Sequence, residues 1–141
     1  MSPIPTPFLP RPILALVGMY FIATLAHFAH NAEYIAFYPG MPVWLTREKV
    51  YLAWLGVTSL GCAAFVLSRL GLRALALLAL GAYGAFGLDG LAHYTLALCS
   101  EHTFPANLTI WSEAGTGLLL LFASSLLLGR RFSPAIRGRD A

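Results

Sequence analysis

Apolar residues are gathered into four long segments separated by short polar stretches. The segments cover residues 13–36, 50–67, 74–98 and 106–128. Each has about the 20 residues that an α-helix needs to cross the hydrocarbon core of a bilayer. A spanning backbone must be helical because lipid offers its amides no hydrogen-bonding partners. The links are short, so the pattern predicts an all-α fold, a four-helix transmembrane bundle with up-down-up-down topology.

The composition supports a membrane protein. Hydrophobic residues make up 58% of the 141 residues and charged residues only 11%, whereas a soluble domain carries about 25% charged residues. This excludes a soluble enzyme, a disordered chain and a disulfide scaffold. The first segment has some features of a cleaved signal peptide, but its apolar character continues past His30, so we expect it to remain as a helix. Residues 1–141 are therefore expected to form a single polytopic membrane domain.

Basic residues are distributed unevenly between the two ends of the predicted bundle. The first and third links contain only Arg47 and Lys49. The N-terminus, the second link and a tail at residues 129–141 contain the other seven, which are Arg11, Arg69, Arg73, Arg130, Arg131, Arg137 and Arg139. The positive-inside rule then predicts that both termini are cytoplasmic and that the tail contacts anionic headgroups rather than nucleic acid. The bias toward alanine, leucine and arginine favours a bacterial inner membrane.

Ionisable residues are concentrated in the outer half of the predicted bundle, which faces the periplasm. His27, Asp89 and Glu113 lie 14 to 15 residues from the inner ends of three different segments, or about 21–23 Å at 1.5 Å per residue. His30 and His93 lie one turn further out. A charged side chain facing lipid costs about 2.5–3.5 kcal/mol even on insertion scales. We therefore expect these side chains to converge on one pocket.

The spacing of these residues is compatible with a metal site. His27 and His30 fall on one face of the first helix, and Asp89 and His93, four residues apart, fall on one face of the third. Imidazole and carboxylate are the common ligands of transition metals. The sequence thus predicts a zinc, iron or copper ion. Its predicted ligands are His27, His30, Asp89, His93, Glu113 and, from the third link, His102.

Three classes of function are compatible with such a cluster. The first is a metalloenzyme acting on an apolar substrate, or a metal-handling factor, with Glu113 and Asp89 as ligands or proton carriers. The second is a metal-free acid/base catalyst, similar in format to the small four-helix membrane isomerases, that acts on a lipid-phase substrate. The third is a haem or quinone anchor, or an accessory subunit of a larger membrane complex. A homo-oligomer is compatible with all three.

Four further features of the sequence carry structural expectations. The glycines Gly81, Gly84, Gly87 and Gly90 favour close helix packing, although they also suit a groove for a flat cofactor. Cys62 and Cys99 lie too far apart in depth to form a disulfide. Asn107 is a candidate N-cap of the fourth helix. Aromatic residues near the first and third links, namely Tyr38, Trp44, Tyr51, Trp54, Tyr94 and Trp111, are typical of an outer interfacial belt.

Overall fold

The computed structural model describes residues 9–132, and this part of the chain is helical without any strand. Four helical regions are long and apolar enough to cross a membrane. They are α1 (Arg11–Glu33), α2 (Arg47–Arg69), the run from α3 (Arg73–Ala85) through η2 (Phe86–Ala92) to α4 (His93–Leu96), and α5 (Phe104–Phe132). The short segments η1 (Ile35–Phe37) and η3 (Cys99–Glu101) lie in the links. The all-helical prediction is confirmed, and Arg137 and Arg139 of the predicted tail lie outside the described residues.

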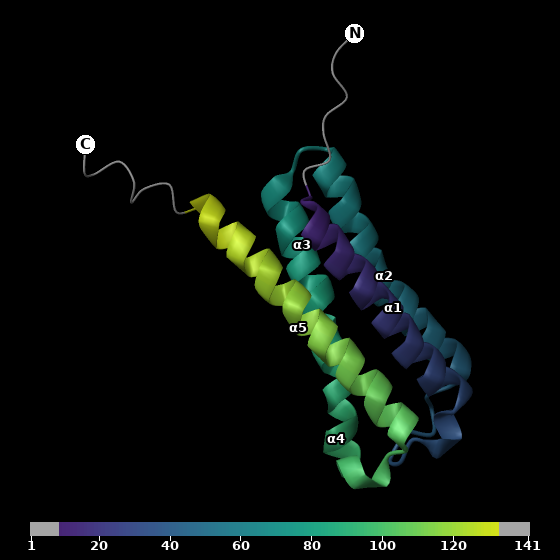
Figure 1. Cartoon of the computed structure of the whole chain (residues 1–141). Helices are drawn as coiled ribbons and strands as arrows, with labels where there is room; N and C mark the ends of the chain where they lie inside the picture. Colours follow the sequence, from purple (N-terminus) through teal and green to yellow (C-terminus); the bar gives the residue numbers. More distant parts are fainter. Residues whose placement is uncertain (1–8, 133–141) are drawn as a thin grey trace, which may run out of the picture.

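Consecutive helical regions run in opposite directions (Figure 1). The described ends of the chain, at Leu9 and Phe132, lie at the same end of the bundle as the turn between α2 and α3, and the opposite end holds η1, α4 and the two long links. Helix α5 packs against α1, α3 and η2, whereas α2 packs against α3 and α1. Helix α2 has little contact with η2, so these two elements separate toward the end that carries the links.

The ends of the helices differ from the predicted ones. The first helix stops at Glu33 rather than residue 36, because the chain turns into η1. Helix α5 begins at Phe104, so Asn107 lies inside it and the prediction that it is the N-cap was wrong. Its side chain instead accepts a hydrogen bond from the hydroxyl of Tyr94 (2.7 Å) and donates one to the carbonyl of Cys99 (3.0 Å), which ties the third link to α5.

The third spanning region changes its helical geometry at Phe86. A continuous α-helix was predicted over residues 74–98, but residues 86–92 form a 3-10 helix with a tighter turn. In this geometry residues three apart lie above one another. Gly87, Gly90 and His93 therefore share the face that packs toward α1 and α5, as their surroundings show: a side chain on Gly87 would meet the ring of Tyr20, and one on Gly90 would meet the carboxylate of Glu113.

Glycines bring the backbones of α3 and α5 into direct contact. A Cβ on Gly84 would lie 2.6 Å from the carbonyl oxygen of Gly117, and a Cβ on Gly117 would lie 2.6 Å from that of Gly84. Such distances leave no space for a side chain on either residue. The prediction of close packing is confirmed, and α5 covers Gly81, Gly84 and Gly87, so these three positions leave no groove for a flat cofactor.

Candidate functional site

A cluster of buried polar side chains lies in the half of the bundle that carries the long links. We call this cluster the polar core. Its side chains are at most 8% exposed and come from α1, α4, α5 and both links. The members are Thr24, His27, Asn31, Tyr38, His93, His102 and Glu113. The sequence-based expectation that histidines and a carboxylate from three helices converge is met by His27, His93 and Glu113.

Glu113 occupies the deepest position of the polar core and is only 1% exposed. The hydroxyl of Thr24 donates a hydrogen bond to Oε1 of Glu113 over 2.6 Å. The second oxygen, Oε2, lies 3.6 Å from Nε2 of His27 and has no hydrogen-bonding partner among the described residues. A distance of 3.6 Å is too long for a direct hydrogen bond. One oxygen of the buried carboxyl group is thus hydrogen-bonded, and the other has no hydrogen-bonding partner among the described residues.

The hydrogen bonds of His27 determine which of its nitrogens faces Glu113. The hydroxyl of Thr109 donates to the carbonyl oxygen of Ala106 over 2.9 Å, so its oxygen can accept from Nδ1 of His27, which lies 3.3 Å away. In a neutral imidazole the other nitrogen is then an acceptor. The lone pair of the ring is then on Nε2, the nitrogen that lies 3.6 Å from Oε2 of Glu113.

His93 and His102 extend the polar core toward the long links. The ring centre of His93 lies 5.4 Å from that of His27 and 6.0 Å from that of His102. The amide of Asn31 donates to Nε2 of His93 over 3.2 Å, and Nδ1 of His102 donates to the carbonyl of Leu98 over 3.0 Å. Nδ1 of His93 and Nε2 of His102 are both buried and have no partner among the described residues. Most buried polar atoms in proteins are hydrogen-bonded, so these nitrogens mark a place where a polar group can bind.

Tyr38 closes the polar core from the first link. It was expected in an outer aromatic belt, but its side chain is only 4% exposed and its ring centre lies 5.0 Å from that of His93. Burial raises the pKa of its phenol to about 12, and its hydroxyl forms a hydrogen bond with Nδ1 of His30 over 2.8 Å. The belt prediction was wrong for Tyr38, whereas Trp44 and Trp111 are exposed as expected.

His30 lies on the other side of Tyr38 and does not face His27. It is half-buried and lines a separate hollow with Tyr34 and Phe37. Since its Nδ1 is engaged by Tyr38, the two histidines of the predicted pair on α1 do not point at one centre.

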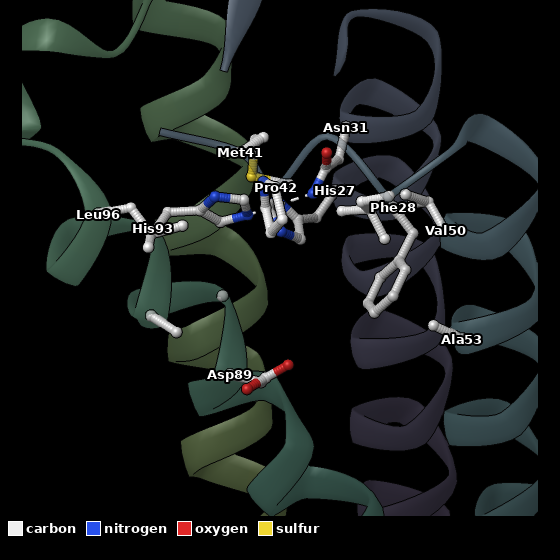
Figure 2. Close-up of a pocket in the computed structure, with 13 residues that line it drawn as sticks. His27, Phe28, Asn31, Met41, Pro42, Val50, Ala53, Asp89, His93 and Leu96 are labelled. Carbon is white, nitrogen blue, oxygen red and sulfur yellow. Dashed lines mark hydrogen bonds between the residues drawn. The ribbon is translucent and has the colours of Figure 1, made fainter. Parts of the chain in front are cut away.

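Asp89 also lies apart from the polar core, for a geometric reason. In an α-helix a residue and the fourth one after it differ by about 40° in direction, but in a 3-10 helix they differ by about 120°. The 3-10 geometry of η2 therefore turns Asp89 away from the face of His93. Its carboxylate is exposed and lies below His27 and His93 in Figure 2.

A pocket of about 240 Å³ connects Asp89 with the two histidines. It lies between α1, α2 and the η2–α4 region, where α2 and η2 separate, and residues 41–45 of the first link cover it (Figure 2). Its polar lining consists of His27, Asn31, His93 and Asp89. The remaining wall is formed by apolar side chains and glycine, which are Phe28, Met41, Pro42, Leu45, Val50, Ala53, Gly90, Ala92 and Leu96. We call it the lateral pocket.

The predicted set of six metal ligands is only partly assembled. Within residues 9–132 no three His, Cys, Asp or Glu side chains are arranged to hold a metal ion. His27, His93 and Glu113 are neighbours and His102 adjoins His93, but His30 and Asp89 face other surroundings. Cys62 and Cys99 are free and exposed, in agreement with the prediction that they form no disulfide.

Three members of the polar core, Thr24, Asn31 and Tyr38, were not among the predicted site residues. Thr24 is one of four buried residues on α1 that follow each other at intervals of four, three and four positions, together with Tyr20, His27 and Asn31. This spacing marks one face of a helix and was available in the sequence. Tyr38 has no such signal, because a link residue has no helical period to place it.

Comparisons with protein-family models, with curated proteins and with solved structures find no significant match to this chain. The site must therefore be interpreted from its own chemistry.

Proposed function

We propose that this chain is an integral membrane protein that catalyses proton transfer on an amphipathic, lipid-phase molecule bound in the lateral pocket. The observation that carries the proposal is the buried pair of Glu113 and His27 directly behind that pocket, with the facing atoms Oε2 and Nε2 separated by 3.6 Å. Ionisable groups within a membrane-spanning segment are expensive to keep and are functional candidates by default.

The pair can take up a proton and return it at a different atom. His27 lines the pocket and Glu113 lies behind it. Nε2 of His27 accepts a proton from a C–H or O–H bond of the bound molecule, and the carboxylate of Glu113 stabilises the resulting imidazolium. Return of the same proton to another position of the molecule completes an isomerisation, which needs no further reactant. Removing water from such a pair strengthens its electrostatic coupling.

The walls of the pocket indicate the class of molecule. Apolar side chains from α1, α2 and the first link form most of the lining, and polar groups are confined to His27, Asn31, His93 and Asp89. Binding sites for small organic ligands typically combine an apolar lining with a few placed polar groups. The pocket lies beside α2 within the spanning region, so a molecule dissolved in the bilayer reaches it without crossing water.

The proposed orientation places the polar core in the outer leaflet of a bacterial inner membrane. Arg11, Arg69, Arg73, Arg130 and Arg131 all lie at the end of the bundle opposite to the long links. By the positive-inside rule this end is cytoplasmic, and the polar core faces the periplasmic side.

Deuterium incorporation tests the catalytic proposal across all lipid classes at once. The protein is reconstituted in vesicles of total lipid extract in deuterated buffer, and the lipids are surveyed by mass spectrometry. We expect one lipid class to gain deuterium with the wild-type protein. Glu113→Gln and His27→Gln should each slow this by about 10²- to 10⁴-fold, the usual contribution of acid/base catalysis. Glu33→Gln is the matched control, because Glu33 is exposed and bonded to Tyr51. Exchange that persists in Glu113→Gln contradicts the proposal.

The second candidate function is that of a transition-metal site. It is supported by the same distance between His27 and Glu113. Two ligand atoms at about 2.0–2.1 Å from one tetrahedral ion lie about 3.4 Å apart, close to the 3.6 Å between Nε2 of His27 and Oε2 of Glu113. Nε2 of His102 has no partner among the described residues, and Nδ1 of His93 offers a lone pair when the Asn31 amide is turned so that its oxygen accepts from Nε2 of His93. Zinc, iron or copper held by these four residues would polarise a substrate oxygen or activate water.

Elemental analysis separates the two candidates. A metal protein, purified in detergent and reconstituted with zinc, iron or copper, binds the ion stoichiometrically, and Glu113→Gln releases it. An acid/base catalyst loses deuterium exchange in the same variant and has no metal to lose. Stoichiometric metal in the wild-type protein would favour the second candidate over the first.

A further inference from the structure

Asp89 differs from the other carboxylates of the spanning segments in what it faces. Glu33 is paired with Arg47, Glu48 is hydrogen-bonded to Thr46, and Glu113 accepts a hydrogen bond from Thr24. Asp89 forms no hydrogen bond or ion pair with any described residue, and its side chain lines the lateral pocket (Figure 2). The 3-10 geometry of η2 directs it there rather than toward His93. The carboxylate therefore lies at the membrane-embedded end of a mostly apolar pocket.

The described chain provides no cation for Asp89. At the end of the bundle with the long links the basic residues are Arg47 and Lys49, and both are engaged: Arg47 pairs with Glu33 over 2.9 Å, and Lys49 donates to the carbonyl of Trp44 over 2.8 Å. The other arginines of the described chain lie at the opposite end. An ion pair is favourable where a charged group of a ligand meets an opposite charge beside an apolar wall. Asp89 offers such a group to a cation that occupies the pocket.

We infer that the lateral pocket binds the cationic head of an amine-bearing amphiphile, with Asp89 as its counter-ion. The inference rests on the proposed function in one respect, since it takes this pocket as the substrate site, and it narrows the substrate to an amine. The ring of Phe28 lines the same pocket, and an aromatic face attracts an ammonium group. Asn31 and His93 supply neutral hydrogen-bonding groups at the opposite end.

The size of the pocket fits a head group rather than a whole lipid. Its volume of about 240 Å³ is below the range of about 300–1,000 Å³ that encloses a drug-sized ligand. The walls contributed by Val50 and Ala53 belong to α2. Leu96 lines the pocket and is also exposed, so its side chain offers an apolar contact for the hydrocarbon tail where the bound molecule leaves the pocket.

Matched amphiphiles that differ only in their head group test this inference. Dodecylamine, dodecanol and dodecanoate are titrated against the protein in detergent micelles, and 1:1 complexes are quantified by native mass spectrometry. We expect dodecylamine to bind at least about tenfold more tightly than dodecanol, and dodecanoate to bind least. Asp89→Asn should remove the preference for the amine, and Asp89→Glu should retain it. The control Glu33→Gln should leave the preference unchanged, because Glu33 lies outside the pocket.

Each outcome bears on the inference. Equal binding of amine and alcohol by the wild-type protein, or a preference for amine that survives in Asp89→Asn, overturns it. If Asp89→Asn does not fold, Ala53→Trp provides an independent arm: the added ring fills the pocket wall, and 1:1 amine binding must be lost. A protein that selects amines through Asp89 but shows no deuterium exchange would refute the catalytic proposal alone, while exchange with no amine selectivity would refute this inference alone.

Discussion

The carboxyl group of Glu113 is stabilised by a residue that lies 89 positions earlier in the chain. Thr24 donates the hydrogen bond to Oε1, and without it this buried group has no direct hydrogen bond from the described residues. Leaving a buried polar group unsatisfied costs about 1–3 kcal/mol. Thr24 is therefore a positioning residue that fixes the orientation of Glu113 toward His27.

Replacement of Thr24 measures this role. We expect Thr24→Val to lower the free energy of unfolding by about 1–3 kcal/mol, because valine has the shape of threonine and cannot donate. Thr24→Ser should restore most of the stability. Thr116→Val is the control, since the Thr116 hydroxyl bonds only to carbonyl oxygens of its own helix. Thermal unfolding in detergent gives the values. If Thr24→Val unfolds like the control, the hydroxyl does not hold the carboxyl group.

Individual residues also show which parts of the candidate site could be predicted from the sequence. Depth counting placed His27, His93 and Glu113 together correctly, because lipid forces ionisable groups on neighbouring helices toward one another. It placed His30 with them wrongly, because His30 lines a separate hollow, whereas Asp89 shares the lateral pocket with His27 and His93 but is not part of the polar core. His30 is diverted by the hydroxyl of Tyr38, which comes from a link and follows no periodicity. The 3-10 geometry of η2 turns the side chain of Asp89 away from the face of His93 and toward the lateral pocket.

At the scale of elements, the decisive feature is the change from α3 to η2. Four spanning segments were predictable because twenty apolar residues in succession have few other stable states. The 3-10 segment was not, since a hydrophobicity pattern does not distinguish 3.6 from 3.0 residues per turn over seven residues. The contact between backbones at Gly84 and Gly117 fixes where α5 crosses this region and thereby places Glu113 beside Gly90.

Glycine substitutions test the importance of that crossing. Gly84→Ala puts a methyl group 2.6 Å from the carbonyl of Gly117, so the helices must separate. We expect destabilisation by about 1–3 kcal/mol, typical of overpacking, and a weaker preference for amines because the pocket is distorted. Gly115→Ala, where a Cβ meets nothing within 4 Å, should be neutral or stabilising, as alanine favours a helix by up to about 1 kcal/mol. Unfolding in detergent distinguishes them. Equal stability of the two variants would show that the crossing tolerates separation.

At the scale of the whole molecule, all long links and the polar core lie at one end, and the arginines Arg69, Arg73, Arg130 and Arg131 lie at the other. This asymmetry predicts one orientation in the membrane. Helix α2 contributes apolar wall rather than charge to the site: the half near the long links lines the lateral pocket through Val50 and Ala53.

Labelling of the two free cysteines can test this orientation. Cys99 is exposed in the third link, whereas Cys62 lies within α2. With the proposed topology, a membrane-impermeant thiol reagent added to intact spheroplasts should label Cys99. Cys99→Ser should abolish labelling, and Cys62→Ser should leave it unchanged. Mass spectrometry of the purified protein reads out the modification. Labelling of Cys99 only after the membrane is permeabilised would reverse the proposed orientation.

The crossing of α3 and α5 has a mechanical consequence for the whole bundle. Two backbones in contact at Gly84 and Gly117 have no layer of side chains between them to slide or compress. A change in the relative position of the two helices is therefore expected to be a rotation about this contact. Spreading of α3 and α5 at the end that carries the long links would then be accompanied by a movement of the same two helices at the opposite end.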